Sequence, residues 1–121
     1  MRTLPDKITP LELKSGTVMM DGGNFIVDPN DWSEEFALHM AKEEGIELTP
    51  LHWDVINYMR ERLAEDGIMV DVRFVSKFLA KQQGISKKEA HNLLYQLFPY
   101  GYVKQACRIS GMKQPRAWST G

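Results

Sequence analysis

Apolar residues recur at helical spacing in several stretches of the chain, and residues that favour helix ends flank each stretch. Trp32, Phe36 and Met40 recur every four residues, which places them on one face of a helix. The same pattern in the later stretches, together with a short segment before Gly111, predicts five helices. Their expected bounds are 32–44, 50–66, 71–83, 86–98 and 101–110.

Short polar side chains stand where four of these helices are expected to begin. Asp31 is followed three residues later by Glu34, and Ser86 by Glu89; both pairs fit a capping box. Residues that favour the N-cap position also precede the second and third helices. Glycine follows the first three helices, and glycine readily adopts the left-handed conformation in which helices often end. The caps are Thr49 and Asp71, and the glycines are Gly45, Gly67 and Gly84.

The stretch TVMMDGGNFIV predicts a β-hairpin with strands at 17–20 and 24–27, because its two glycines can adopt the positive φ angles of a tight turn. Residues 1–15 are polar and contain two prolines, so we expect a loosely held lead-in. Residues 112–121 lack apolar periodicity and are expected to form a C-terminal arm. The whole chain, 1–121, is therefore expected to be one mainly α domain with five helices, an N-terminal β-hairpin and an arm.

The third and fourth helices have the spacing of a helix-turn-helix core. Counting from Ser76, Ala80 stands fifth and Gly84 ninth, so a small residue lies where the helices touch and a glycine supplies the turn. The fourth helix opens with Lys87 and Lys88, residue types that contact phosphates. The unit serves either packing alone or DNA binding, and the pattern does not choose between them.

The net charge of −1 hides a division between the two halves of the chain. Residues 1–72 contain 6 Lys and Arg against 15 Asp and Glu, a net charge of −9, whereas residues 73–121 contain 9 against 1, a net charge of +8. A basic half attracts an anionic partner, such as nucleic acid, an acidic protein face, or a phosphorylated or sulfonated small molecule. The alternative is that the two halves fold against each other and neutralise.

The rest of the sequence argues against several classes of function. It contains neither a run of 18 apolar residues nor a secretion signal, so we expect no membrane span and a cytoplasmic location. His39, His52 and His91 lack the spacing of metal ligands, and no phosphate-binding loop or catalytic signature occurs. We therefore expect no metal, no cofactor and no catalysis by the chain alone.

Cys107, in KQACRISG, is the only cysteine, which excludes an internal disulfide. Lys104 lies three residues before it and Arg108 follows it, and cations favour the reactive thiolate. The C-terminal half of a helix disfavours an anion, however, and cysteine at an apolar helix position is most often buried. These residues leave open whether Cys107 is a sulfur or redox site or an inert core residue.

Three stretches, EEGIELTPLHWDVINYMR, LYQLFPYG and KQACRISG, resemble in this order and spacing the DsrC/TusE/DsvC family of sulfur-relay proteins. This family includes the gamma subunit of dissimilatory sulfite reductase. The resemblance covers roughly residues 16–115, and it implies a small helical fold, a mobile arm, and partners that are sulfite reductase or sulfur-transfer proteins. In the sulfite-reductase-linked members a nearly terminal cysteine carries sulfur and a second cysteine lies eleven positions upstream; the tRNA-thiolation members keep only the terminal one.

Cys107 matches the upstream cysteine of that family, and Trp118 stands where the carrier cysteine would be. Tyr102 also departs from the family, in which proline usually follows the glycine. The resemblance therefore implies a regulatory or accessory protein that docks to sulfur-metabolism partners without sulfur transfer at the arm tip. Two alternatives remain: Cys107 itself accepts sulfur, or the helix-turn-helix unit regulates by binding DNA.

The expected docking surface is the basic half together with the arm. Trp118 is the one large apolar side chain of the tip, and we expect it to anchor the arm, either in a partner's pocket or on its own domain near Cys107. The predicted partner-binding residues are Arg73, Lys77, Lys87, Lys88, Lys104, Arg108, Lys113, Arg116 and Trp118.

Overall fold

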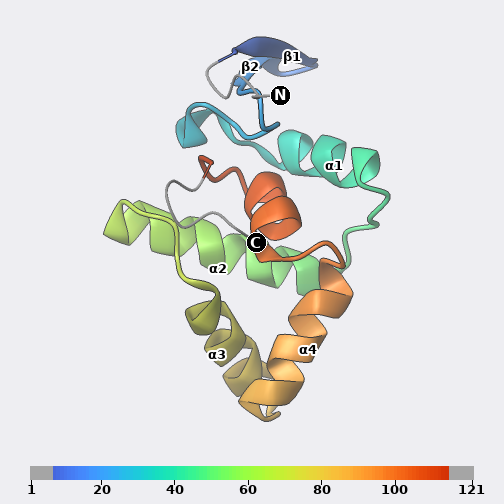
Figure 1. Ribbon diagram of the computed structural model, residues 1–121, viewed down its shortest axis with the longest axis vertical. Helices are drawn as coiled ribbons and strands as arrows, with labels where there is room; N and C mark the ends of the chain where they lie inside the picture. The colour runs from blue at the N-terminus through green and yellow to red at the C-terminus, as the bar shows by residue number, and fades with distance from the viewer. Residues whose placement is uncertain (1–6, 115–121) are drawn as a thin grey trace, which may run out of the picture.

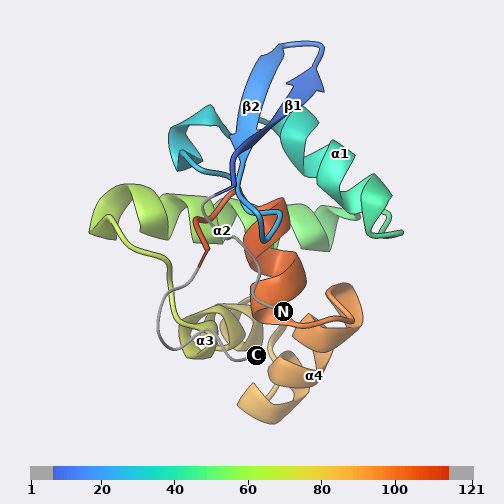
Figure 2. The same cartoon turned by 45° about the horizontal axis from the view of Figure 1, so that its top comes forward.

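The computed structural model describes residues 7–114 and shows a mainly helical domain with an N-terminal hairpin. Helix α2 crosses the middle of the molecule, with the hairpin and α1 on one side of it and the pair α3–α4 on the other (Figure 1). Turned by 45°, the hairpin projects from the end opposite to α3 and α4 (Figure 2). The elements are β1 (Thr9–Leu13), β2 (Gly16–Met20), η1 (Pro29–Asp31), α1 (Glu34–Glu43), α2 (Pro50–Asp66), α3 (Val72–Gln83), α4 (Lys87–Leu97) and η2 (Tyr102–Cys107).

Most of the predicted helix ends are confirmed. Gly67 and Gly84 end α2 and α3 in the left-handed conformation, and Ser86 caps α4 in a capping box. Thr49 caps α2 through a box completed by His52, whose Nδ1 accepts from the Thr49 backbone N–H at 3.0 Å. The other ring nitrogen of His52 therefore donates to the Leu97 carbonyl, 2.8 Å away, so this histidine joins α2 to the end of α4.

The prediction for the first helix start was wrong by two residues. Ser33, not Asp31, caps α1, and its side chain accepts from the Phe36 N–H. Asp31 instead closes the short 3₁₀ helix η1, which begins at Pro29. The capping-box spacing at Asp31 was misleading because proline at 29 starts a separate turn just before the helix.

The hairpin exists, but its pairing differs from the prediction. Strand β2 pairs in antiparallel register with residues 9–13, and residues 24–27 contribute only one bridge, between Met20 and Ile26. The Asp21 carboxylate accepts from the N–H groups of Gly23 and Phe25 at 2.8 and 2.9 Å. This local turn satisfies the backbone inside DGGN, and the chain after it returns to β2 only at Ile26 and Val27. Part of the expected lead-in is therefore an edge strand.

The last described segment forms the centre of the core. Ala106, Cys107, Ile109 and Met112 are all fully buried, and the helical segment that carries the first three lies beside α2 in both views (Figures 1 and 2). The arm was expected to begin at 112, but the burial of Met112 extends the packed domain through that residue. Lys113 and Gln114 are exposed, and the rest of the expected arm lies outside the described residues. Within residues 7–114, no helix is long and apolar enough to cross a membrane.

We predict that Gly111→Ala destabilises the protein more than a matched glycine substitution does. Gly111 has φ +75°, and an added Cβ would lie within 2.8 Å of the Trp32 Cβ, so strain and overlap combine. The expected cost is about 3 kcal/mol in the free energy of unfolding, measured by urea titration. Gly45 has φ +74° and open space around it, so Gly45→Ala should cost only about 1 kcal/mol. Equal losses at both sites would contradict the overlap.

Candidate functional site

Cys107 lies inside the core on the final helical segment. Its side chain is fully buried, and its Sγ lies 3.1 Å from the Sδ of Met69, in the loop that joins α2 to α3. Residues 102–107 form a π-helical turn that starts after Gly101, which has φ +100°. This wide turn continues directly into Arg108 in α conformation, so the thiol is held by backbone on both sides.

The surroundings of Cys107 oppose ionisation of the thiol. Burial raises the pKa of Cys107 far above its usual range, and the neighbouring Tyr102 hydroxyl lowers it only in part. Because the thiolate is the nucleophile, a thiol held neutral in the core reacts slowly. Of the two expected activating cations, Lys104 is exposed, while the Arg108 guanidinium donates to the Gly23 carbonyl at 2.8 Å and covers the Phe25 ring. Arg108 thus holds the DGGN turn.

Tyr102 fills the space beside Cys107. It is buried, and its hydroxyl donates to the backbone carbonyl of Val70. Burial raises the pKa of Tyr102 above its usual range, so the hydroxyl stays protonated and keeps its role as donor. The tyrosine noted in the sequence as a departure therefore ties the loop around Met69 to the cysteine-bearing helix.

A clamp of Arg60 and Trp32 holds the end of that helix. Arg60, on α2, donates to the carbonyls of Ser110 and Gly111, each at 3.2 Å, and its guanidinium lies 4.6 Å from the centre of the Trp32 ring. Trp32 in turn donates from Nε1 to the Ile109 carbonyl at 3.0 Å. These contacts satisfy carbonyls that a helix end leaves open. Sequence reasoning missed Arg60, which carries no local signal because its acceptors lie about 50 residues later in the chain.

The predicted docking cations divide into two groups. Arg73 and Lys77 on α3, and Lys87 and Lys88 on α4, are exposed and lie on the half of the molecule away from the hairpin. Lys104 and Lys113 are exposed near the cysteine-bearing helix, whereas Arg108 is half-buried in its turn contact. The structure therefore brings four of the cations onto one helix pair. Arg116 and Trp118 lie outside the described residues.

No group of three or more His, Cys, Asp or Glu side chains that could hold a metal ion occurs within residues 7–114. His52 is taken up by helix packing, and His91 lies with its ring 4.8 Å from that of Tyr95 on the same helix.

The α3–α4 pair turns at Gly84 as its spacing predicted, with Ala80 and Ile85 partly buried against the core.

The structure is that of a small helical protein with an N-terminal hairpin. Its only cysteine lies on the final helix and is buried in the core. Residues 12–117 match the family model described as "DsrC like protein". The chain therefore belongs to the DsrC-like family.

Curated relatives of the chain carry the name sulfurtransferase TusE. The protein from Pectobacterium atrosepticum is 35% identical over 105 residues, which cover 87% of this chain and 95% of the relative. The protein from Photorhabdus laumondii is 38% identical over 95 residues, which cover 78% of this chain and 85% of the relative.

Solved structures show the same fold. The oxidised gamma subunit of dissimilatory sulfite reductase from Archaeoglobus fulgidus has 33% identity and a TM-score of 0.79, covering 90% of this chain and 98% of that one. DsrC from Allochromatium vinosum has 36% identity and a TM-score of 0.77, covering 92% and 98%. A chain in the crystal structure of dissimilatory sulfite reductase I has 26% identity and a TM-score of 0.73, covering 90% and 98%.

We predict that the Cys107 thiol makes stability depend on alkaline pH. Its pKa is raised by burial, so between pH of about 8.5 and 10 the unfolded thiol loses its proton while the folded one keeps it. The free energy of unfolding should therefore fall as pH rises, by up to about 1.4 kcal/mol per pH unit. Urea titrations across this window measure the slope, and Cys107→Ala should flatten it.

The same burial predicts that a thiol reagent such as DTNB labels the native chain only after denaturant is added. Rapid stoichiometric labelling at neutral pH without denaturant would contradict the buried position of the thiol.

Proposed function

We propose that this protein acts within sulfur metabolism as a docking partner with a regulatory or accessory role, rather than as a carrier that hands on sulfur. The observation that carries the proposal is the burial of its only thiol, within a fold shared with TusE sulfurtransferases and sulfite reductase gamma subunits. A carrier needs a nucleophilic sulfur that reaches its partner. Cys107 is shielded and neutral, and position 118 holds tryptophan.

The alternative, in which Cys107 accepts sulfur, requires the core to open. The thiol would have to leave Met69, and Tyr102 would have to release Val70, before a donor could approach. Both contacts belong to one packed segment whose far end is clamped by Arg60. Docking needs no such opening, because the exposed cations of α3 and α4 are already accessible.

A sulfur-loading experiment separates these two functions. On incubation with inorganic polysulfide, a reactive thiolate bonds to a terminal sulfur, the adjacent S–S bond breaks, and the shortened polysulfide leaves with the electron pair. We expect the native chain to gain no sulfur by intact mass spectrometry. Trp118→Cys, which restores a cysteine eleven positions after Cys107, should gain one sulfur atom and serves as the positive control. A gain in the native chain that Cys107→Ser abolishes would make Cys107 the acceptor.

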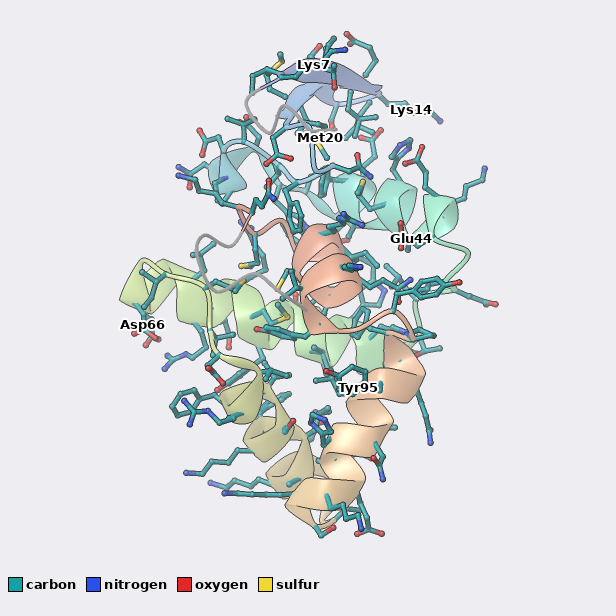
Figure 3. All side chains as sticks on the ribbon, viewed as in Figure 1. Lys7, Lys14, Met20, Glu44, Asp66 and Tyr95 are labelled. Atoms are coloured by element: carbon teal, nitrogen blue, oxygen red, sulfur yellow. The ribbon has the colours of Figure 1, made fainter. Side chains whose placement is uncertain are left out.

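The docking surface is tested by charge reversal. Lys87→Glu with Lys88→Glu should weaken binding to purified dissimilatory sulfite reductase by about tenfold at low salt, and added salt should reduce the difference. Titration by fluorescence anisotropy measures the affinity. The matched control is Lys14→Glu with Lys42→Glu, which changes the net charge equally; Lys14 lies at the hairpin end (Figure 3).

Equal losses in the two double variants would remove α3–α4 from the docking surface. If duplex DNA binds instead, with an affinity that falls steeply with salt and with the same two substitutions, the DNA-binding alternative replaces the proposal.

A further inference from the structure

An open cleft of about 1030 Å³ lies beside the cysteine-bearing segment. It is bounded by the end of α2, the loop into α3 and residues 112–114, and Leu63, Ile68, Met69 and Met112 contribute apolar side chains to its wall. Met69 also touches the Cys107 sulfur, so the cleft is separated from the thiol by one side chain. Methionine is flexible and polarisable, and methionine-lined surfaces accept apolar groups of varied shape.

Arg60 lines this cleft with a charge that the described residues do not neutralise. Three of its five N–H donors bind neutral carbonyls, two at the end of the final helix and one at Pro29, 3.0 Å away. No carboxylate among residues 7–114 lies within ion-pair distance of it. The one acidic wall residue, Asp71, accepts from the Arg73 Nε at 3.0 Å. Burial without a counter-ion lowers the pKa of Arg60.

Lys113 adds a second cation to the wall, next to Met112. The cleft therefore combines an apolar floor with two cations, and its only carboxylate is already paired with Arg73. A guanidinium in such a site gains most from a carboxylate, which can accept two parallel N–H bonds from it. A simple inorganic anion would satisfy the charge but leave most of the 1030 Å³ and the apolar wall unused.

We propose that this cleft binds a peptide segment of the docking partner in which a carboxylate stands next to a large apolar side chain. The carboxylate pairs with Arg60 and Lys113, and the apolar side chain packs on Ile68 and Met69, which are accessible apolar residues of the wall. This assignment rests on the proposed docking function and names the chemistry of the partner. It places recognition beside the one thiol of the protein, so that docking covers Met69 and further shields Cys107.

Two small probes that differ in one group test the site. N-acetyltryptophan carries an indole and a carboxylate, and N-acetyltryptophanamide carries the same indole without the charge. In ¹H–¹⁵N NMR titrations of the full chain at pH 7, we expect N-acetyltryptophan to shift the amides of Leu63, Met69 and Met112. We expect it to bind about tenfold more tightly than the amide, since a hydrogen bond to a charged group contributes about this much.

Three variants of the full chain test which residue causes the preference for N-acetyltryptophan over its amide. Arg60→Gln should remove it, and Lys113→Gln, at an exposed position, should reduce it about threefold, as expected for a partly solvated charge pair. Lys42→Gln, at an exposed position of α1 away from the cleft and from the docking cations, should leave it unchanged. If Arg60→Gln does not fold, the native chain and Lys113→Gln decide the matter.

Equal affinities for the two probes, or shifts that map away from the cleft, would overturn the assignment. So would a rise of about tenfold in probe affinity in Trp118→Ala, because the chain's own tryptophan would then be the occupant. Since the probes need no partner, probe binding combined with failure to bind sulfite reductase would count against the docking function and leave the cleft chemistry intact.

Discussion

The segment from Tyr102 to Met112 lies buried at the centre of the packing, and the other elements are arranged around it. Its end is held by Arg60 and Trp32, its middle by the Arg108 contact with the DGGN turn, and its start by the Tyr102 bond to Val70. Gln105 adds a bond from its side-chain nitrogen to the Glu44 carboxylate at 3.0 Å. The hairpin region, the end of α1, α2 and the α2–α3 loop are thus all joined to one short helix.

This arrangement explains why we expect the thiol of Cys107 to react slowly in the folded protein. A helix that fills a small core must present apolar or neutral groups to its neighbours, because an unpaired buried charge is costly. Cys107 meets that requirement as a thiol and fails it as a thiolate. The same constraint accounts for Tyr102, whose hydroxyl has a carbonyl partner and stays protonated. Packing around the sulfur therefore bears on the expected chemistry of this family member as much as the count of cysteines does.

Charge is separated in the fold as well as in the sequence. The cations of α3 and α4 face solvent on one half of the molecule, and of these only Arg73 forms an ion pair within residues 7–114, with Asp71. A surface of this kind attracts an acidic partner over a distance but gives little specificity by itself. The cleft at the start of α3 combines a cation with apolar side chains, and in the proposal such a combination distinguishes one anionic segment from another. Under the proposed function, attraction and recognition are thus assigned to neighbouring surfaces.

The sequence alone determined the helices, their glycine stops, most of their caps and the family, because these depend on residues within a few positions of each other or on a fixed order of motifs. It also located the charge division. Only the tertiary structure decided the rest. Strand β2 pairs along its length with residues 9–13 and through one bridge with residues 24–27, while the Asp21 carboxylate satisfies the DGGN backbone locally. The burial of Cys107, the turn contact of Arg108 and the clamp at Arg60 depend on side chains brought together across 38 to 85 positions of sequence. Local patterns record propensity and periodicity, whereas solvent exclusion and hydrogen-bond satisfaction are properties of the assembled core.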